Sequence, residues 1–208
     1  MIDYLRDPEE IYRRSFAAIR AEADLAGVPG DLAALALRLV HASGMPDLVG
    51  DLAWSEGAGE AGRAALAAGA PVLVDAEMVA HGIIRRRLPA GNEIVCRLGA
   101  PEADACAKSK GTTRSAAAVD LWRPRLEGAV VAIGNAPTAL FRLLEILAEG
   151  EPRPAVILGF PVGFIGAAEA KEALIAEARG LAYVTLRGRR GGSAMAAAAV
   201  NALAGGGE

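Results

Sequence analysis

The feature that most constrains this fold is a unit that occurs three times between residues 129 and 203: an apolar strand, a glycine-rich turn and a helix. The three turns are 134–138, 159–166 and 187–193. Parallel strands that are joined by helices end at the same edge of their sheet, so we expect the turns to share one edge. Glycine lets a backbone approach a ligand, and each helix directs free N–H groups toward its turn. The three arginines of the last turn make this edge a predicted site for a flat, anionic molecule.

From residue 71 onward, apolar strands alternate with helices. Such alternation predicts right-handed crossovers and a parallel sheet that is covered on both faces. We therefore predict one α/β domain over residues 1–208, with three layers and a flavodoxin-like, mainly parallel five-stranded sheet. The strands are expected at 71–74, 93–97, 129–133, 155–158 and 182–186, and the helices at 76–80, 113–122, 137–149, 166–179 and 193–203.

Two extra helices are expected before this α/β part. Asp7 is expected to cap the first helix, and Pro8 is expected to be its first residue. Apolar residues follow at helical spacing. Residues 27–30 end that helix, and Asp31 is expected to cap a second one that stops at Gly44.

Composition excludes several functions. The net charge is −3 and no basic stripe with interleaved aromatic residues is present, which argues against nucleic-acid binding. The longest apolar stretches are about half of the roughly 20 residues that a membrane span needs. Two cysteines and two histidines, without CxxC spacing, predict no metal site. The N-terminus does not resemble a signal peptide, so reduced thiols and a cytoplasmic location are expected.

One motif has the wrong context for its usual function. Residues 57–62 match GxGxxG, with Glu77 about 20 residues further on, as in dinucleotide-binding proteins. The preceding residues 52–56 do not have the pattern of a buried strand, so we do not predict nucleotide binding there.

Several motifs in order along the chain resemble the precorrin-8X methylmutase family of corrin (vitamin B12) biosynthesis. They are Arg38-x-x-His41, Asp75-x-Glu77, 113–117, 134–140, 161–169 and 188–193. The likeness runs through essentially the whole chain, and Ala170 departs from it where family members usually have serine. The resemblance implies a homodimer with its active site at the subunit interface. It also implies a reaction: migration of a methyl group from ring carbon 11 to ring carbon 12 of precorrin-8X, giving hydrogenobyrinate. Neither a redox cofactor nor a methyl donor is then needed.

The resemblance also assigns roles to residues near the N-terminus. Taken alone, His41 could be a surface or helix-capping histidine. The family implies that it is the proton donor and acceptor, and histidine exchanges protons near neutral pH. Arg38 lies three residues earlier on the same helix face and is a candidate substrate ligand. Ser15 could bond back to its own helix, but the family has a substrate contact at this position.

Further candidates come from the second half of the chain. Candidate ligands for the substrate carboxylates are Arg114, Arg187, Arg189 and Arg190, and at least one of the four is expected to belong to a solvated basic rim instead. Thr138 and Ser193 are expected to cap helices first and to contact substrate second. Residues 85–87 are either a solvated loop or a contact to the carboxylates of the substrate across the dimer. His81 is expected to end a short helix, with a substrate role as the alternative.

Two other functions remain open at this point. The first is the isomerase of the anaerobic route, whose substrate already contains cobalt; the motif at 88–93 favours the metal-free substrate. The second is a tetrapyrrole carrier without catalysis, which would have no need of His41.

Overall fold

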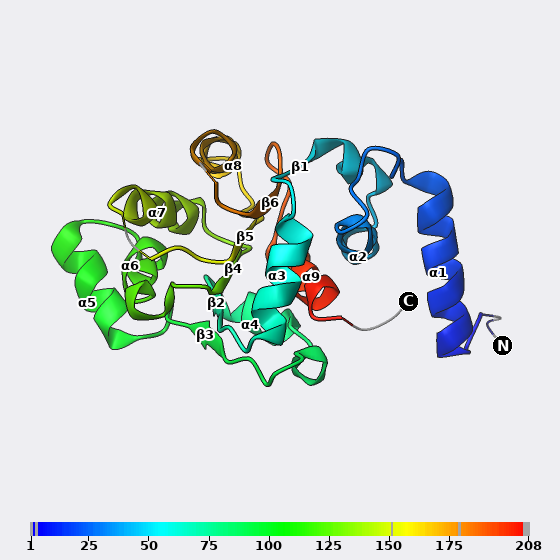
Figure 1. The fold of residues 1–208 in the computed structure, drawn as a ribbon, viewed down its shortest axis with the longest axis horizontal. Coiled ribbons are helices and arrows are strands. Elements are labelled where there is room, and N and C mark those ends of the chain that lie inside the picture. Colours follow the sequence, from blue (N-terminus) through cyan, green and yellow to red (C-terminus); the bar gives the residue numbers. More distant parts are fainter. Residues whose placement is uncertain (1, 3, 151, 179, 206–208) are drawn as a thin grey trace.

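The structure is a computed structural model that describes residues 2, 4–150, 152–178 and 180–205. Its centre is a six-stranded sheet in the order β1-β6-β5-β4-β2-β3 (Figure 1). The five predicted strands are present, and each pairs in parallel with its neighbours among the five. They are β2 (Val72–Val74), β3 (Ile94–Cys96), β4 (Val130–Ile133), β5 (Val156–Gly159) and β6 (Tyr183–Leu186). Their order, β3-β2-β4-β5-β6, is the flavodoxin-like order, which confirms the predicted fold class.

The sheet has one strand more than predicted. Strand β1 (Leu52–Trp54) pairs antiparallel with β6 at the sheet edge, and its three residues are half-buried. A three-residue edge strand has neither the continuous apolar run of a buried strand nor a long alternation. The Ser55 hydroxyl oxygen accepts a 3.0 Å hydrogen bond from Tyr183 N and extends this pairing. The predicted count of five strands is therefore wrong by this edge strand.

Alternate strand residues divide the core into two layers. Val130 and Ala132 of β4 belong to the cluster that includes α2 (Ala33–Ser43), α3 (Ala58–Ala67), α4 (Glu77–Gly82) and α9 (Ser193–Leu203). Val131 and Ile133 belong to the opposite cluster, with α6 (Arg114–Asp120), α7 (Pro137–Ala148) and α8 (Ala167–Glu177). Helix α5 (Pro101–Lys110) lies beside α6. The three-layer prediction is confirmed.

Helix α1 (Pro8–Glu22) stands apart from the sheet and packs on α2 (Figure 1). Asp7 caps it by accepting a 3.0 Å hydrogen bond from Glu9 N, and Gly44, at φ +69°, ends α2, both as predicted. Asp31 does not cap α2, because Leu32 occupies that position. The Asp31 carboxylate instead accepts a 3.0 Å hydrogen bond from Gly59 N.

The GxGxxG segment belongs to helix α3 and has a packing role. A Cβ atom on Gly59 would lie 2.3 Å from the carbonyl oxygen of Asp31, and one on Gly62 would lie 2.6 Å from Leu203. These glycines therefore allow α3 to pack closely on its neighbours. Within the part of the chain that the structure describes, no helix is both long and apolar enough to cross a membrane.

Candidate functional site

The three glycine-rich turns lie side by side along the carboxyl edge of the sheet, as predicted. Val162 N donates to Asn135 O at 3.4 Å, which joins the turns after β4 and β5. Gly163 N donates to Arg189 O at 3.3 Å, and Gly192 N donates to Phe160 O at 2.8 Å. The second and third turns are therefore joined at two points.

The glycines of these turns serve close packing within the protein. A Cβ atom on Gly191 would lie 2.4 Å from Phe160 O, and one on Gly134 would lie 2.8 Å from the Cα atom of Ser193. Real Cβ contacts are not this short, so both positions require glycine. The reasoning that these glycines make room for a ligand is therefore wrong at Gly134 and Gly191.

A buried carboxylate fills the N-terminus of α7. Asp75 follows β2 and is 1% exposed. Its Oδ1 accepts from Gly134 N at 2.8 Å, and its Oδ2 accepts from Asn135 N at 2.9 Å and from Ala136 N at 2.8 Å. Burial raises the pKa of Asp75, and the N–H donors oppose that rise. The gap between β2 and β4 is the switch point where flavodoxin-like sheets bind ligands, but here the protein's own anion takes the helix N–H groups.

A second internal contact fixes the turn after β6. Lys171 of α8 is fully buried, and its Nζ donates to Arg190 O at 2.6 Å. The Arg190 guanidinium in turn binds Asp47 at 2.7 Å and also Asp51, both in the 3₁₀ helix η1 (Pro46–Asp51) that follows α2. The C-terminal end of the α2–η1 segment is therefore attached to the carboxyl edge of the sheet.

Lys171 gives a testable pH dependence. Burial lowers its pKa from 10.5 to about 8, so between these values the unfolded chain binds more protons than the folded chain. The free energy of unfolding is therefore expected to rise by about 2–3 kcal/mol between pH 7 and pH 10.5 through this residue. Urea titrations of the parent, Lys171→Met and the exposed control Lys108→Met measure it. The rise should persist in Lys108→Met and be lost in Lys171→Met, and an equal rise in all three would contradict this assignment.

His41 lies in the last turn of α2 and is exposed. Its ring stacks on that of Phe16 at a centroid distance of 5.0 Å, and the Tyr12 ring lies 6.2 Å away. Arg38 Nη2 donates to the Tyr12 hydroxyl at 2.7 Å, and its guanidinium lies 5.5 Å from the Phe16 centroid. Arg38 and His41 therefore face the same aromatic pair on α1. Tyr12 and Phe16 were not predicted as site residues, although they are four residues apart and therefore lie on one face of α1.

Ser15 and His41 line one cavity of about 350 Å³ between α1 and the end of α2. Ser15 is half-buried there, from the helix face next to Phe16. The structure thus brings together the predicted residues Ser15, Arg38 and His41.

Arg114 and Thr138 form a second group, at the starts of α6 and α7. The hydroxyl groups of Thr113 and Thr138 share a 2.8 Å hydrogen bond, and Arg114 is exposed with its Nη1 3.7 Å from Asp104. Thr138 does not cap α7: Ala136 is the N-cap residue, and its N–H donates to Asp75.

Arg187, Arg189 and Ser193 form a third group in and after the last turn. Arg187 pairs with Glu172 at 2.6 Å, and the guanidinium of Arg189 lies 5.3 Å from the centroid of Phe164. Ser193 is the first residue of α9, and Gly192, not Ser193, is the N-cap. Among the described residues, the lining of the His41 cavity contains no member of the second or third group. One chain therefore presents the predicted site in separate parts.

Fold and site together define a class of protein. It is a flavodoxin-like α/β protein with a carboxylate of its own in place of a bound phosphate. A small cavity is lined by its His41, and the His41 ring lies beside two aromatic rings that also contact Arg38. Among the residues that the structure describes, no three side chains of histidine, cysteine, aspartate or glutamate gather where they could hold a metal ion.

Comparison with known proteins identifies the family. A family sequence model described as precorrin-8X methylmutase matches residues 10–205. A precorrin-8X methylmutase from Pseudomonas aeruginosa is 65% identical over 98% of both chains, and one from Sinorhizobium sp. is 58% identical over 97% of this chain and 96% of the relative. The solved structure of a precorrin-8X methylmutase from Thermus thermophilus superposes with a TM-score of 0.86 at 40% identity, over 94% of each chain. This chain belongs to the precorrin-8X methylmutase family, the isomerases that act in cobalamin biosynthesis.

Proposed function

We propose that this protein moves a methyl group from ring carbon 11 to ring carbon 12 of precorrin-8X, giving hydrogenobyrinate. The observation that carries the proposal is the position of His41, an exposed imidazole in a cavity with Ser15 and against the ring of Phe16. The relatives at 65% and 58% identity bear the name of this activity, without cobalt.

The reaction requires the protein to supply a proton and to hold the substrate in a fixed orientation. The shift is intramolecular and conserves atoms, so a proton that is given to the macrocycle must be returned. We assign this exchange to His41, since imidazole serves as both acid and base near neutral pH. The half-buried Tyr12 ring lies beside it, over the buried Phe16, and Arg38 supplies positive charge at Tyr12. Holding the macrocycle there supplies the orientation that an intramolecular reaction needs.

We also propose that the working site is shared between two copies of this chain in a homodimer. The supporting observation is the separation, within one chain, of the His41 group from Arg114, Thr138, Arg187, Arg189 and Ser193. Two large apolar side chains are exposed on the second glycine-rich turn, which follows β5: Phe164 is 81% exposed and Ile165 is 89% exposed. Such a patch is typical of a contact surface. A cytoplasmic location fits the unpaired Cys96 and Cys106.

An anaerobic optical assay tests the activity, because the methyl shift changes the conjugation of the ring. Purified protein should convert precorrin-8X, and should convert it faster than cobalt-precorrin-8. The reverse preference would assign the protein to the cobalt-containing substrate. Binding of precorrin-8X without any spectral conversion would instead leave a carrier.

A further inference from the structure

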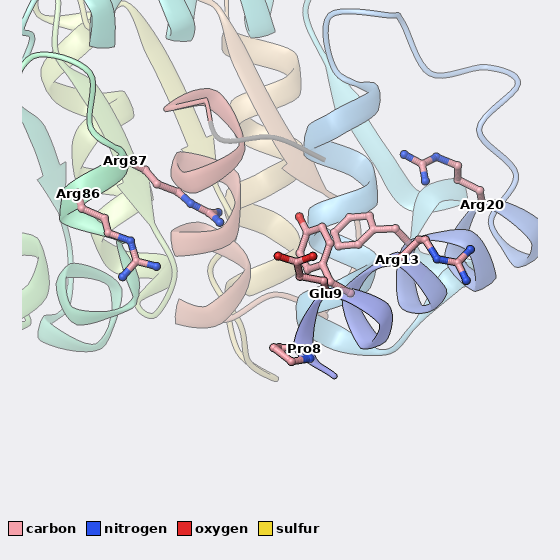
Figure 2. A pocket seen from close by; sticks show the side chains of 8 residues that line it. Pro8, Glu9, Arg13, Arg20, Arg86 and Arg87 are labelled. Carbon is pink, nitrogen blue, oxygen red and sulfur yellow. The ribbon is translucent and has the colours of Figure 1, made fainter. Parts of the chain in front are cut away.

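A second and larger cavity opens between α1 and the 3₁₀ helix η2 (Arg85–Arg87), which are far apart in the sequence. Its volume is about 850 Å³, within the range of about 300–1,000 Å³ that is usual for small-molecule sites. Figure 2 shows Arg86 and Arg87 on one side and Arg13 and Arg20, on α1, on the other, with Glu9 between them. We call this space the arginine cavity.

The η2 side of the arginine cavity is held in place. Ile83 and Leu88, on either side of the arginines, are 4% and 8% exposed. Asn201 of α9 accepts a 2.7 Å hydrogen bond from Ile84 N and donates a 2.9 Å hydrogen bond to Gly82 O. The backbone that carries Arg86 and Arg87 is therefore fixed by the core before any ligand binds.

Two arginines that line the arginine cavity form no ion pair with any described residue. Arg87 Nη1 is buried and has no hydrogen-bond acceptor in the described part of the chain. A buried donor without an acceptor is costly, more so when it is charged. The Arg86 side chain likewise forms no ion pair with any residue that the structure describes, whereas Arg13 binds Glu10 at 2.6 Å. Neither η2 arginine is therefore held by a carboxylate of the described chain: the exposed Arg86 head group can take up an anion, and Arg87 keeps one buried nitrogen without an acceptor.

The arginine cavity shares a wall with the His41 group. Tyr12 and Phe16 line it, and the same rings contact Arg38 and His41. A flat molecule placed against the half-buried Tyr12 ring would therefore lie at the arginine cavity. Guanidinium binds carboxylate through two parallel hydrogen bonds, which fits a molecule with several carboxylates on its rim.

We propose that the arginine cavity binds carboxylate side chains of the tetrapyrrole whose ring lies at His41, through Arg86 and Arg87. This inference rests on the proposed function, and it adds a binding wall that is separate from the glycine-rich turns. These arginines hold the rim of the substrate and take no part in proton exchange.

The test compares Arg86→Gln/Arg87→Gln with the parent and with Arg125→Gln. Arg125 pairs with Glu93 at the opposite, amino-terminal edge of the sheet, so this control removes an arginine away from the cavity. Optical titration gives the dissociation constant of hydrogenobyrinate and of its methyl ester, and light scattering gives the mass of each variant. We expect the double variant to bind hydrogenobyrinate about 10- to 100-fold more weakly, with KM raised similarly and kcat little changed. The parent's preference for the acid over the ester should largely disappear.

Three outcomes would overturn the inference. A parent that converts precorrin-8X, together with a double variant that binds like Arg125→Gln, would refute the cavity assignment and leave the proposed function standing. A changed mass in the double variant alone would make the arginine cavity a contact between copies. A parent that neither converts precorrin-8X nor binds hydrogenobyrinate would refute the proposed function and this inference with it.

Discussion

Replacing His41 by alanine should lower kcat by about 10²- to 10⁴-fold, the usual contribution of a positioned general acid or base. Hydrogenobyrinate should still bind, because Tyr12, Phe16 and Arg38 remain and the His41 ring is exposed rather than part of the core. Single-turnover absorbance gives the rate, and optical titration gives the dissociation constant. A large loss of turnover with retained binding separates a mutase from a carrier.

The second histidine provides a matched control. His81 also lies in the last turn of a helix, its side chain is 82% exposed, and its Nδ1 is 2.7 Å from Glu77 O. His81→Ala should therefore keep the parent's kcat and KM. Equal losses in the two variants, or full activity in His41→Ala, would remove His41 from the mechanism.

Replacing Asp75 by alanine should lower the free energy of unfolding by about 3–5 kcal/mol. The substitution leaves the N–H groups of Gly134, Asn135 and Ala136 without their acceptor, and Gly134 is buried. Asp75→Asn keeps one oxygen and should lose about half as much, because its NH₂ group then faces at least one N–H donor. Urea unfolding measures both values.

Asp24→Ala is the control for Asp75. The Asp24 carboxylate accepts a single, exposed hydrogen bond from Ala26 N at 3.1 Å, so its loss should change stability by less than about 1 kcal/mol. Should Asp75→Ala unfold at the same urea concentration as Asp24→Ala, the carboxylate would not be what holds the start of α7.

The sequence predicts the parallel part of this fold because its signals are local. Each of the five parallel strands is an apolar run followed by a turn, and Asp7 and Gly44 mark helix ends with their own chemistry. Strand β1 is not predicted by local signals, because it is a three-residue edge strand that forms through its pairing with β6. Asp31 looks like a cap in sequence, but Gly59, which it binds, is 28 residues away.

The site is predictable in its residues and not in its arrangement. The spacing of Arg38 and His41 places both on one helix face, and the structure agrees. Their contact with Tyr12 and Phe16 depends on how α1 packs on α2, and no local sequence pattern predicts that packing. The same holds for Asp75, whose partners lie about sixty residues further on. Unpartnered donors such as Arg87 Nη1 are visible only when every neighbour is in place.

The most direct test of the central claim follows the methyl group itself. Precorrin-8X with a ¹³C-labelled methyl at ring carbon 11 is incubated anaerobically with the purified protein, and the product is examined by ¹³C NMR. The account predicts that the whole label appears at ring carbon 12, without any added methyl donor and undiluted when an unlabelled donor is present. Label that stays at ring carbon 11, or that is diluted by the donor, would contradict an intramolecular methyl shift by this protein.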